Sequence, residues 1–202
     1  MQIEEREVLA WAKQDGLLPA VVQDAATRRV LMLGYMNREA LDATLETGRV
    51  TFFSRSKQRL WMKGETSGDV LELVSLEADC DLDTLLVQAI PHGPTCHLKR
   101  ESCFAAAPGD FIAELDALVA ERERKRPADS YTTRLFEGGV RRIAQKVGEE
   151  GVEAALAAVA QDDDDLLGEA ADLVYHLLVL LRARGLGLDD VTRTLRRRHS
   201  VE

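Results

Sequence analysis

The sequence lacks the features typical of secreted, membrane-spanning and nucleic-acid-binding proteins. Residues 1–7 are too acidic for a signal or transit peptide, and no apolar run approaches the roughly 18 residues needed to span a bilayer. Acidic residues outnumber basic ones by 35 to 26, and the excess is present in both halves of the chain. Because neither half is basic, we expect no binding to nucleic acid. The lack of a signal peptide and of a long apolar run predicts a cytoplasmic protein that does not bind a membrane.

Cysteine is also scarce, with only Cys80, Cys96 and Cys103 present. An odd number of cysteines in a reducing compartment argues against a disulfide framework. Two explanations remain open from composition alone. Either the thiols bind a metal or take part in catalysis, or they are buried in a core.

The pattern of apolar residues divides the chain into two parts. Residues 1–107 contain strand-like runs and all the cysteines, whereas residues 108–202 show helical periodicity almost throughout. Proline and glycine interrupt the chain at residues 105–110, where the periodicity changes. We therefore expect two domains: a β-rich, barrel-like α+β domain over residues 1–107 and an all-α helical bundle over residues 108–202.

The expected elements follow from alternation, capping residues and glycine stops. In the first half, one helix should begin after Asn37 and end at Gly48, among six strands at residues 18–23, 30–35, 50–53, 60–62, 70–76 and 84–90. In the second half, a helix should follow Asp110, and the charged stretch 121–129 should form a loop. Three further helices are expected at residues 139–160, 165–184 and 189–198.

A first acidic cluster recurs with a period of two residues at Asp79, Asp81 and Asp83. On a strand or an extended turn this period places all three carboxylates on one side and Cys80 on the other. Three hard oxygen ligands suit Mg²⁺. The alternative is a solvated acidic turn without a metal.

The three cysteines suit a softer metal, because thiolates favour Zn²⁺. Cys80, Cys96 and Cys103 would supply three ligands and leave the fourth position for water, as in catalytic zinc sites. Since Cys80 should face away from its own aspartates, we expect a homodimer in which a second chain supplies Cys80. His97 is the candidate base, although a lone histidine is more often structural. The H-x-E and P-C-x-x-C pattern of nucleobase deaminases is absent.

Basic residues alternate with aromatic and small residues shortly before this cluster. They are candidates for binding a substrate phosphate, with a solvated basic loop as the alternative. The four residues are Arg55, Lys57, Arg59 and Lys63.

Four segments of the first half carry a resemblance to a known family. They are residues 53–68, DCDLDTLL at 79–86, GPTCH at 93–97 and SCF at 102–104. Together they resemble the phosphoribosyl-AMP cyclohydrolases of histidine biosynthesis, over about residues 16–104. The resemblance implies Mg²⁺ on the three aspartates and Zn²⁺ on the three cysteines, with ligands shared between dimer partners. It also implies addition of water to C6 of an N1-ribosylated adenine and opening of the N1–C6 bond, with His97 assisting proton transfer.

A second acidic cluster has helical spacing. If its two helices pack antiparallel, four or five carboxylates converge, and their repulsion requires cations, for which oxygen ligands favour Mg²⁺. The alternative is an exposed acidic face paired with basic neighbours. A di-iron site lacks its Glu-x-x-His pattern, and His176 is expected to be packed or capping. The cluster comprises Lys146, Glu149, Glu150, Glu153, Glu169 and Asp172.

Three segments of the second half also carry a resemblance: SYT at 130–132, RIAQKVGEEGVE at 142–153 and GEAADLVYHLLVLL at 168–181. They resemble phosphoribosyl-ATP pyrophosphohydrolases, relatives of the all-α nucleoside triphosphate pyrophosphohydrolases, over about residues 108–198. The resemblance implies that the five acids bind Mg²⁺, with Glu150 and Glu153 as catalytic candidates, and that Lys146 contacts phosphate.

Both resemblances together imply a bifunctional enzyme that acts on a small nucleotide. The second half would release pyrophosphate from phosphoribosyl-ATP, and the first half would open the ring of the phosphoribosyl-AMP produced. Two alternatives remain. One is a zinc hydrolase fused to a general nucleoside triphosphate pyrophosphohydrolase, and the other is a metal-stabilised assembly protein without catalysis.

Overall fold

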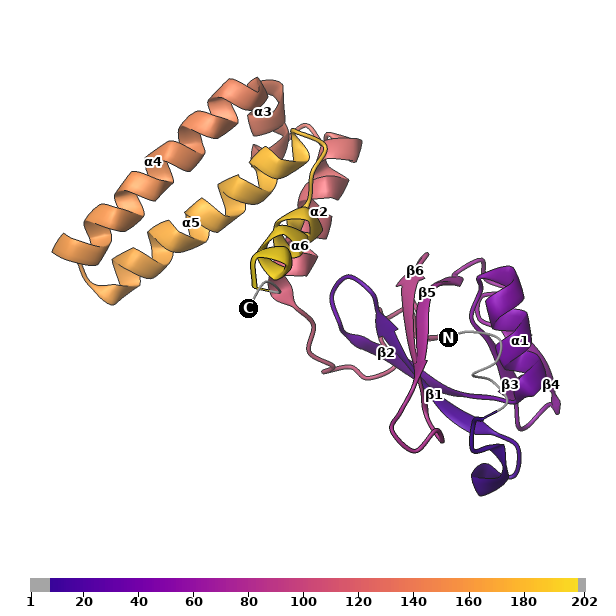
Figure 1. The fold of residues 1–202 in the computed structure, drawn as a ribbon. Helices are drawn as coiled ribbons and strands as arrows, with labels where there is room; N and C mark the ends of the chain where they lie inside the picture. Colours follow the sequence, from indigo (N-terminus) through magenta and orange to yellow (C-terminus); the bar gives the residue numbers. More distant parts are fainter. Residues whose placement is uncertain (1–7, 200–202) are drawn as a thin grey trace. The chain divides into compact units, whose positions relative to one another are not determined.

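The computed structural model describes residues 8–199 and consists of two compact units, residues 1–110 and residues 111–202. Figure 1 shows a strand-rich first unit and a helical second unit. The expected fold class, a β-rich domain followed by an all-α domain, is confirmed. None of the helices in the described part of the chain has the length and hydropathy of a membrane span.

The first unit is built on a four-stranded sheet with the order β2-β1-β6-β5. Its strands are β1 (Leu18–Asp24), β2 (Val30–Met36), β5 (Leu71–Ala78) and β6 (Leu85–Pro91). The central pair β1 and β6 is parallel, and the two outer pairs are antiparallel. A separate hairpin joins β3 (Thr51–Ser54) and β4 (Arg59–Met62). The sheet is therefore open rather than a closed barrel.

One helix, α1 (Arg38–Thr47), packs on this sheet and hairpin. Asn37 caps its start by accepting a hydrogen bond of 2.9 Å from the backbone N–H of Ala40. Gly48 ends it in the left-handed conformation, with φ of 66°. Alternate residues of β1, beginning with Leu18, are fully buried in the core that this helix covers.

A short 3-10 helix, η2 (Trp11–Gln14), precedes β1. The side chain of Trp11 is buried in the core of the first unit. The backbone N–H of Ala10 donates a 2.8 Å hydrogen bond to the carbonyl oxygen of Leu82. This bond ties the start of η2 to the loop between β5 and β6.

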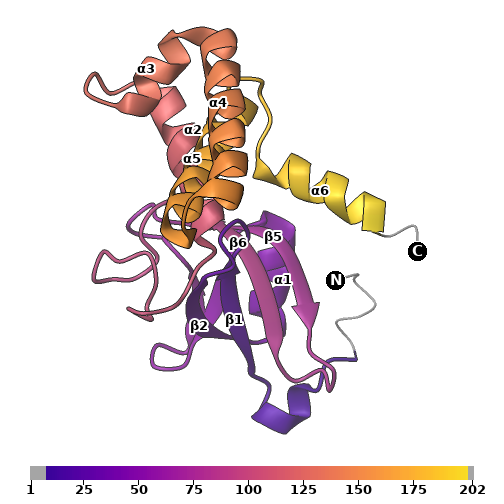
Figure 2. The ribbon, with the colours of Figure 1, turned by 90° about the vertical axis from the view of Figure 1, so that its left-hand side faces the viewer.

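The second unit contains only helices within its described residues. They are α2 (Phe111–Lys125), α3 (Tyr131–Glu137), α4 (Gly139–Ala160), α5 (Asp163–Arg182) and α6 (Leu188–His199). The two long helices, α4 and α5, run side by side in opposite directions (Figures 1 and 2). The buried core lies where α2 and α3 pack against them, around Ile143 and Val179.

One sequence expectation for this unit was wrong, and one helix was missed. Residues 121–125 continue α2 instead of forming a loop, because Lys125 pairs with Glu121 one turn earlier and basic residues end the helix favourably. Helix α3 was not expected at all, because seven residues are too few to show a clear period. The side chain of Ser130 caps it by accepting a hydrogen bond from the backbone N–H of Thr133.

Candidate active sites

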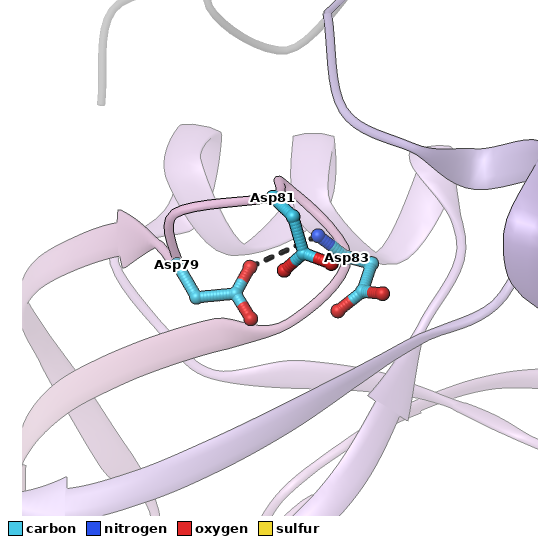
Figure 3. Close-up of side chains that lie close together, drawn as sticks. All are labelled: Asp79, Asp81 and Asp83. Atoms are coloured by element: carbon cyan, nitrogen blue, oxygen red, sulfur yellow. Dashed lines mark hydrogen bonds between the residues drawn. The ribbon is translucent and has the colours of Figure 1, made fainter.

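The first acidic cluster lies in the turn between β5 and β6, outside the strands expected at residues 70–76 and 84–90. Leu82 has a left-handed conformation in this turn, with φ of 64°. Figure 3 shows Asp79, Asp81 and Asp83 pointing toward one another, and one carboxylate oxygen of each lies within 4.8 Å of those of the other two. A strand would separate alternate residues by roughly 6.6 Å. The turn, rather than strand alternation, therefore brings the carboxylates together.

Hydrogen bonds to the aspartate side chains hold the shape of this turn. The Oδ1 atom of Asp79 accepts hydrogen bonds of 3.0 Å from the backbone N–H groups of both Asp83 and Thr84. The hydroxyl of Thr84 in turn donates to Oδ1 of Asp83 at 3.2 Å. The carboxylate of Asp81 is largely exposed.

Lys13, on η2, contacts this cluster and was missed by the sequence analysis. Its Nζ atom lies 2.6 Å from Oδ2 of Asp81 and 3.1 Å from Oδ2 of Asp83. The hydrogen bond from Lys13 lowers the pKa of Asp81 below its ordinary value. Lys13 precedes Asp81 by 68 residues, so no local spacing could have indicated the contact.

A cavity of about 380 Å³ is present in the same unit. The exposed His97 and the buried Cys96 both line it. The hydroxyl of Thr95 is buried and has no hydrogen-bond partner within the described part of the chain. Other lining residues include Trp61, Lys63, Thr95 and Cys103.

Two of the three cysteines are therefore together, and the third is not. Within the described residues, Cys80 is exposed and absent from the cavity lining that includes Cys96 and Cys103. A hydrogen bond from the backbone N–H of Leu98 lowers the pKa of the Cys96 thiol, and burial raises that of Cys103. The expectation that Cys80 faces away from its aspartates applies to an extended segment, and the structure shows a turn here.

Of the four basic residues expected to bind phosphate, one lines the cavity and three do not. Lys63 lines the cavity, where burial lowers its pKa, and its ammonium donates to the carbonyl oxygen of Asp69 at 2.9 Å. The other three candidates lie outside the cavity lining among the described residues. The guanidinium of Arg55 lies 3.8 Å from the centre of the Tyr35 ring, and Arg59 pairs with Glu65 at 2.6 Å. Lys57 is the third candidate outside the cavity lining.

Glycine residues give the cavity wall its shape. Gly93 has φ of 127°, and a Cβ atom there would lie only 2.4 Å from Oδ1 of Asp69. Gly64 has φ of 83°, and a Cβ atom would lie 2.5 Å from the backbone of the same aspartate. Any other residue at either position would move Asp69 and so change the cavity.

The second acidic cluster joins α4 to α5. Oxygen atoms of Glu150, Glu169 and Asp172 lie within 4.8 Å of one another, and Glu150 is only 4% exposed. Burial, followed by repulsion from Glu153, Glu150 and Asp172, raises the pKa of Glu169. A group of like charges held this closely is stabilised by a bound cation.

Lys146 partly neutralises this cluster from the same helix. Its Nζ atom lies 2.6 Å from Oε1 of Glu150 and 3.0 Å from Oε2 of Glu149. This pairing raises the pKa of Lys146 and lowers those of both glutamates. Glu149 also accepts a 2.7 Å hydrogen bond from Gln145, and it lies outside the three-residue group.

His176 is buried beside Glu150, as expected of a packed histidine. Its Nδ1 atom lies 2.9 Å from the backbone carbonyl oxygen of Asp172 and 3.6 Å from Oε1 of Glu150. The hydroxyl of Tyr131 lies 3.0 Å from its other ring nitrogen. Tyr131, which the sequence analysis noted only within a motif, thus connects α3 to the acidic cluster.

Comparisons with known proteins match each unit separately. A family model described as phosphoribosyl-AMP cyclohydrolase matches residues 32–105, and one described as phosphoribosyl-ATP pyrophosphohydrolase matches residues 112–199. Relatives named histidine biosynthesis bifunctional protein HisIE match almost the whole chain. That of Xanthomonas axonopodis pv. citri is 71% identical over 95% of this chain and 93% of its own length. That of Escherichia coli is 58% identical over 97% of this chain and 98% of its own.

Proposed function

The chain belongs to the family of bifunctional histidine biosynthesis proteins, which join a phosphoribosyl-AMP cyclohydrolase to a phosphoribosyl-ATP pyrophosphohydrolase, and we propose how its residues divide the two reactions. The enzyme hydrolyses phosphoribosyl-ATP to phosphoribosyl-AMP and pyrophosphate. It then opens the adenine ring of phosphoribosyl-AMP between N1 and C6. We assign ring opening to residues 1–107 and pyrophosphate release to residues 108–202, so the reaction order is the reverse of the chain order.

One observation carries this division: each unit has its own convergent carboxylate cluster, and only the first unit has cysteines. Metal dependence is general in the cyclohydrolase family, and both clusters could bind a metal. We propose Mg²⁺ for each cluster, because all the ligands are carboxylate oxygens. In the first unit, an ammonium group already lies between two of the carboxylates, which supports a position for a cation.

We propose Zn²⁺ for the cysteines, in a homodimer with ligands from both chains. Cys96 and Cys103 line one cavity and supply two thiolates, while Cys80 is exposed and free to reach a second copy. Bound zinc would supply a Lewis acid that makes a water molecule more acidic.

The cavity side chains would then direct the ring opening. His97 is exposed in the cavity, where its imidazole can accept a proton from water as it attacks C6 and deliver one to N1 as the bond breaks. Lys63 lies in the same cavity and would bind the substrate phosphate. Arg55, Lys57 and Arg59 are proposed as further phosphate contacts at the β3–β4 hairpin.

In the helical unit, the acids of α4 and α5 would form the hydrolytic site. Bound Mg²⁺ would neutralise the charge of the triphosphate. Glu150 and Glu153 would orient the attacking water and accept its proton, and Lys146 would move from Glu149 and Glu150 to the phosphate. The proposed metal ligands are Glu149, Glu150, Glu153, Glu169 and Asp172.

We place the protein in the cytoplasm, because its relatives are enzymes of amino-acid biosynthesis. The direct test incubates the purified full chain with phosphoribosyl-ATP, Mg²⁺ and Zn²⁺ and follows pyrophosphate and the ring-opened product separately. We expect both products, with pyrophosphate formed first. Ordinary nucleoside triphosphates serve as the comparison, and faster hydrolysis of these would favour a general pyrophosphohydrolase. Bound metals without either product would favour an assembly protein.

A further inference from the structure

Lys13 is held over the aspartate cluster by the fold of the first unit. It lies on η2, two residues after the buried Trp11. The hydrogen bond from Ala10 to Leu82 fixes η2 to the turn that carries the aspartates. The contact between Lys13 and the cluster is thus supported by the backbone and does not depend on the lysine side chain alone.

The ammonium group bridges two carboxylates of the cluster. Its distances of 2.6 Å to Asp81 and 3.1 Å to Asp83 are those of charged hydrogen bonds. Without a positive charge, three carboxylates this close would repel one another. Lys13 therefore occupies a position where a divalent cation would also be stabilised.

The two cations cannot both occupy this position. A divalent ion that binds the same Oδ2 atoms of Asp81 and Asp83 must displace the ammonium group. Lys13 can leave at small cost, because its side chain is 49% exposed and its flexible stem reaches into water. The backbone of η2 can stay in place while the ammonium group moves, since it is held by Trp11 and Ala10.

We propose that Lys13 is an intramolecular counter-cation of the aspartate cluster, which keeps the carboxylates together without a metal and competes with the divalent cation. This inference rests on the proposed function, which assigns a cation to the same cluster. It gives Lys13 a role in setting metal affinity. A purely structural ion pair would affect folding stability and leave metal affinity unchanged.

The test measures cation binding to the full-length protein by tryptophan-sensitised Tb³⁺ luminescence, with Mg²⁺ added as the competitor. Both tryptophans, Trp11 and Trp61, lie in the first unit, and Trp11 is on the same 3-10 helix as Lys13. Asp81→Asn identifies the part of the signal that comes from this cluster. Thermal unfolding of each variant in the absence of metal measures the separate effect on stability.

Lys13→Met should bind Tb³⁺ and Mg²⁺ more tightly, by roughly three- to tenfold, the effect expected on losing two exposed ion pairs. Lys13→Arg keeps the charge and should bind no more tightly than the wild type. Lys125→Met makes the same change of charge and removes an exposed ion pair with Glu121 in the other unit, so the cluster signal should not change.

The outcomes separate this inference from the function on which it rests. Equal affinity of Lys13→Met and the wild type, with a signal that Asp81→Asn abolishes, would overturn the role of Lys13 and leave the cation site in place. Weaker binding by Lys13→Met would also overturn it, since Lys13 would then assist the cation. If neither the wild type nor any variant gave Tb³⁺ luminescence, the cation assignment and the role of Lys13 would both be overturned.

Discussion

The two candidate sites use opposite kinds of backbone. The first comprises the aspartate cluster and the cavity and is built mainly from turns and loops. Its residues come from the start, middle and end of the unit, from Lys13 to Cys103. The second is built from two neighbouring helices whose acids recur at three- and four-residue intervals. A helical site is encoded locally, whereas a loop site depends on tertiary contacts and, in our proposal, on a second chain.

The two sites also differ in how their negative charge is balanced. In the helical unit, Lys146 lies on α4 one turn before its partners, Glu149 and Glu150. In the first unit, Lys13 comes from a distant segment held by its own backbone hydrogen bond. Each cluster therefore has an internal ammonium group, but only the local one follows from sequence spacing.

The largest expected effect tests whether the first site needs two chains. Cys80→Ser and Cys96→Ser should each abolish ring opening, because each breaks every zinc site of its homodimer. A heterodimer of the two variants should regain one intact site and about half of the wild-type activity per dimer. Differently tagged chains purified as heterodimers allow the measurement. No recovery from a verified heterodimer would contradict shared ligands.

Metal removal should separate the sites by their ligand chemistry. A strong zinc chelator should abolish ring opening and spare pyrophosphate release, because the helical ligands are all oxygens. Parallel assays of the two products provide the readout. Loss of pyrophosphate release that only zinc restores would show that the carboxylate cluster has been assigned the wrong metal.

A pair of glycine substitutions compares the two backbones directly. Gly93→Ala should destabilise the first unit by about 1–3 kcal/mol, because of its left-handed φ and the clash with Asp69. Gly168→Ala in α5, where a Cβ atom meets nothing within 4 Å, should be neutral or stabilising by up to about 1 kcal/mol. Chemical denaturation measures both. Equal effects would mean that the cavity wall does not depend on Gly93.

The smallest effect concerns pH and Mg²⁺ in the helical unit. The raised pKa of Glu169 means that protonation favours folding, and this contribution is lost as pH rises from the ordinary value of 4.5 through the folded pKa. Glu150 acts oppositely, since its lowered pKa adds stability that is lost as pH falls below 4.5. Because Mg²⁺ relieves the repulsion on ionised Glu169, it should raise the unfolding temperature more at neutral pH than below pH 4.5.

Thermal unfolding with and without Mg²⁺ measures this difference, and Glu169→Gln is the control that removes the repulsion. The wild type should show the larger Mg²⁺ effect at neutral pH. An equal effect at both pH values would indicate that repulsion at Glu169 is unimportant for cation binding.

Much of the architecture could be predicted from the sequence, because capping and alternation are local. The Asn37 cap and the Gly48 stop both lie where their residue types indicate. Helix α3 and the end of α2 could not be predicted, since a short helix has no clear period and a charged run can be a loop or a helix. The convergence of Glu150, Glu169 and Asp172 followed from helical spacing and the packing of two helices.

The loop site was only partly predictable. The clustering of Asp79, Asp81 and Asp83 was expected from their two-residue period, and the structure brings them together in the turn between β5 and β6. The Lys13 contact and the wall formed by Asp69 against Gly93 depend on segments far apart in the sequence. No periodic pattern reports such contacts, because the tertiary fold alone brings the segments together.

The independence of the two sites is tested most directly by one reciprocal assay. Glu150→Gln and Cys96→Ser are each given phosphoribosyl-ATP and, separately, phosphoribosyl-AMP, and pyrophosphate and the ring-opened product are measured. We expect Glu150→Gln to lose pyrophosphate release and keep ring opening of added phosphoribosyl-AMP, and Cys96→Ser to show the reverse. Loss of both activities in either variant, with the fold preserved by circular dichroism, would contradict two independent sites in one chain.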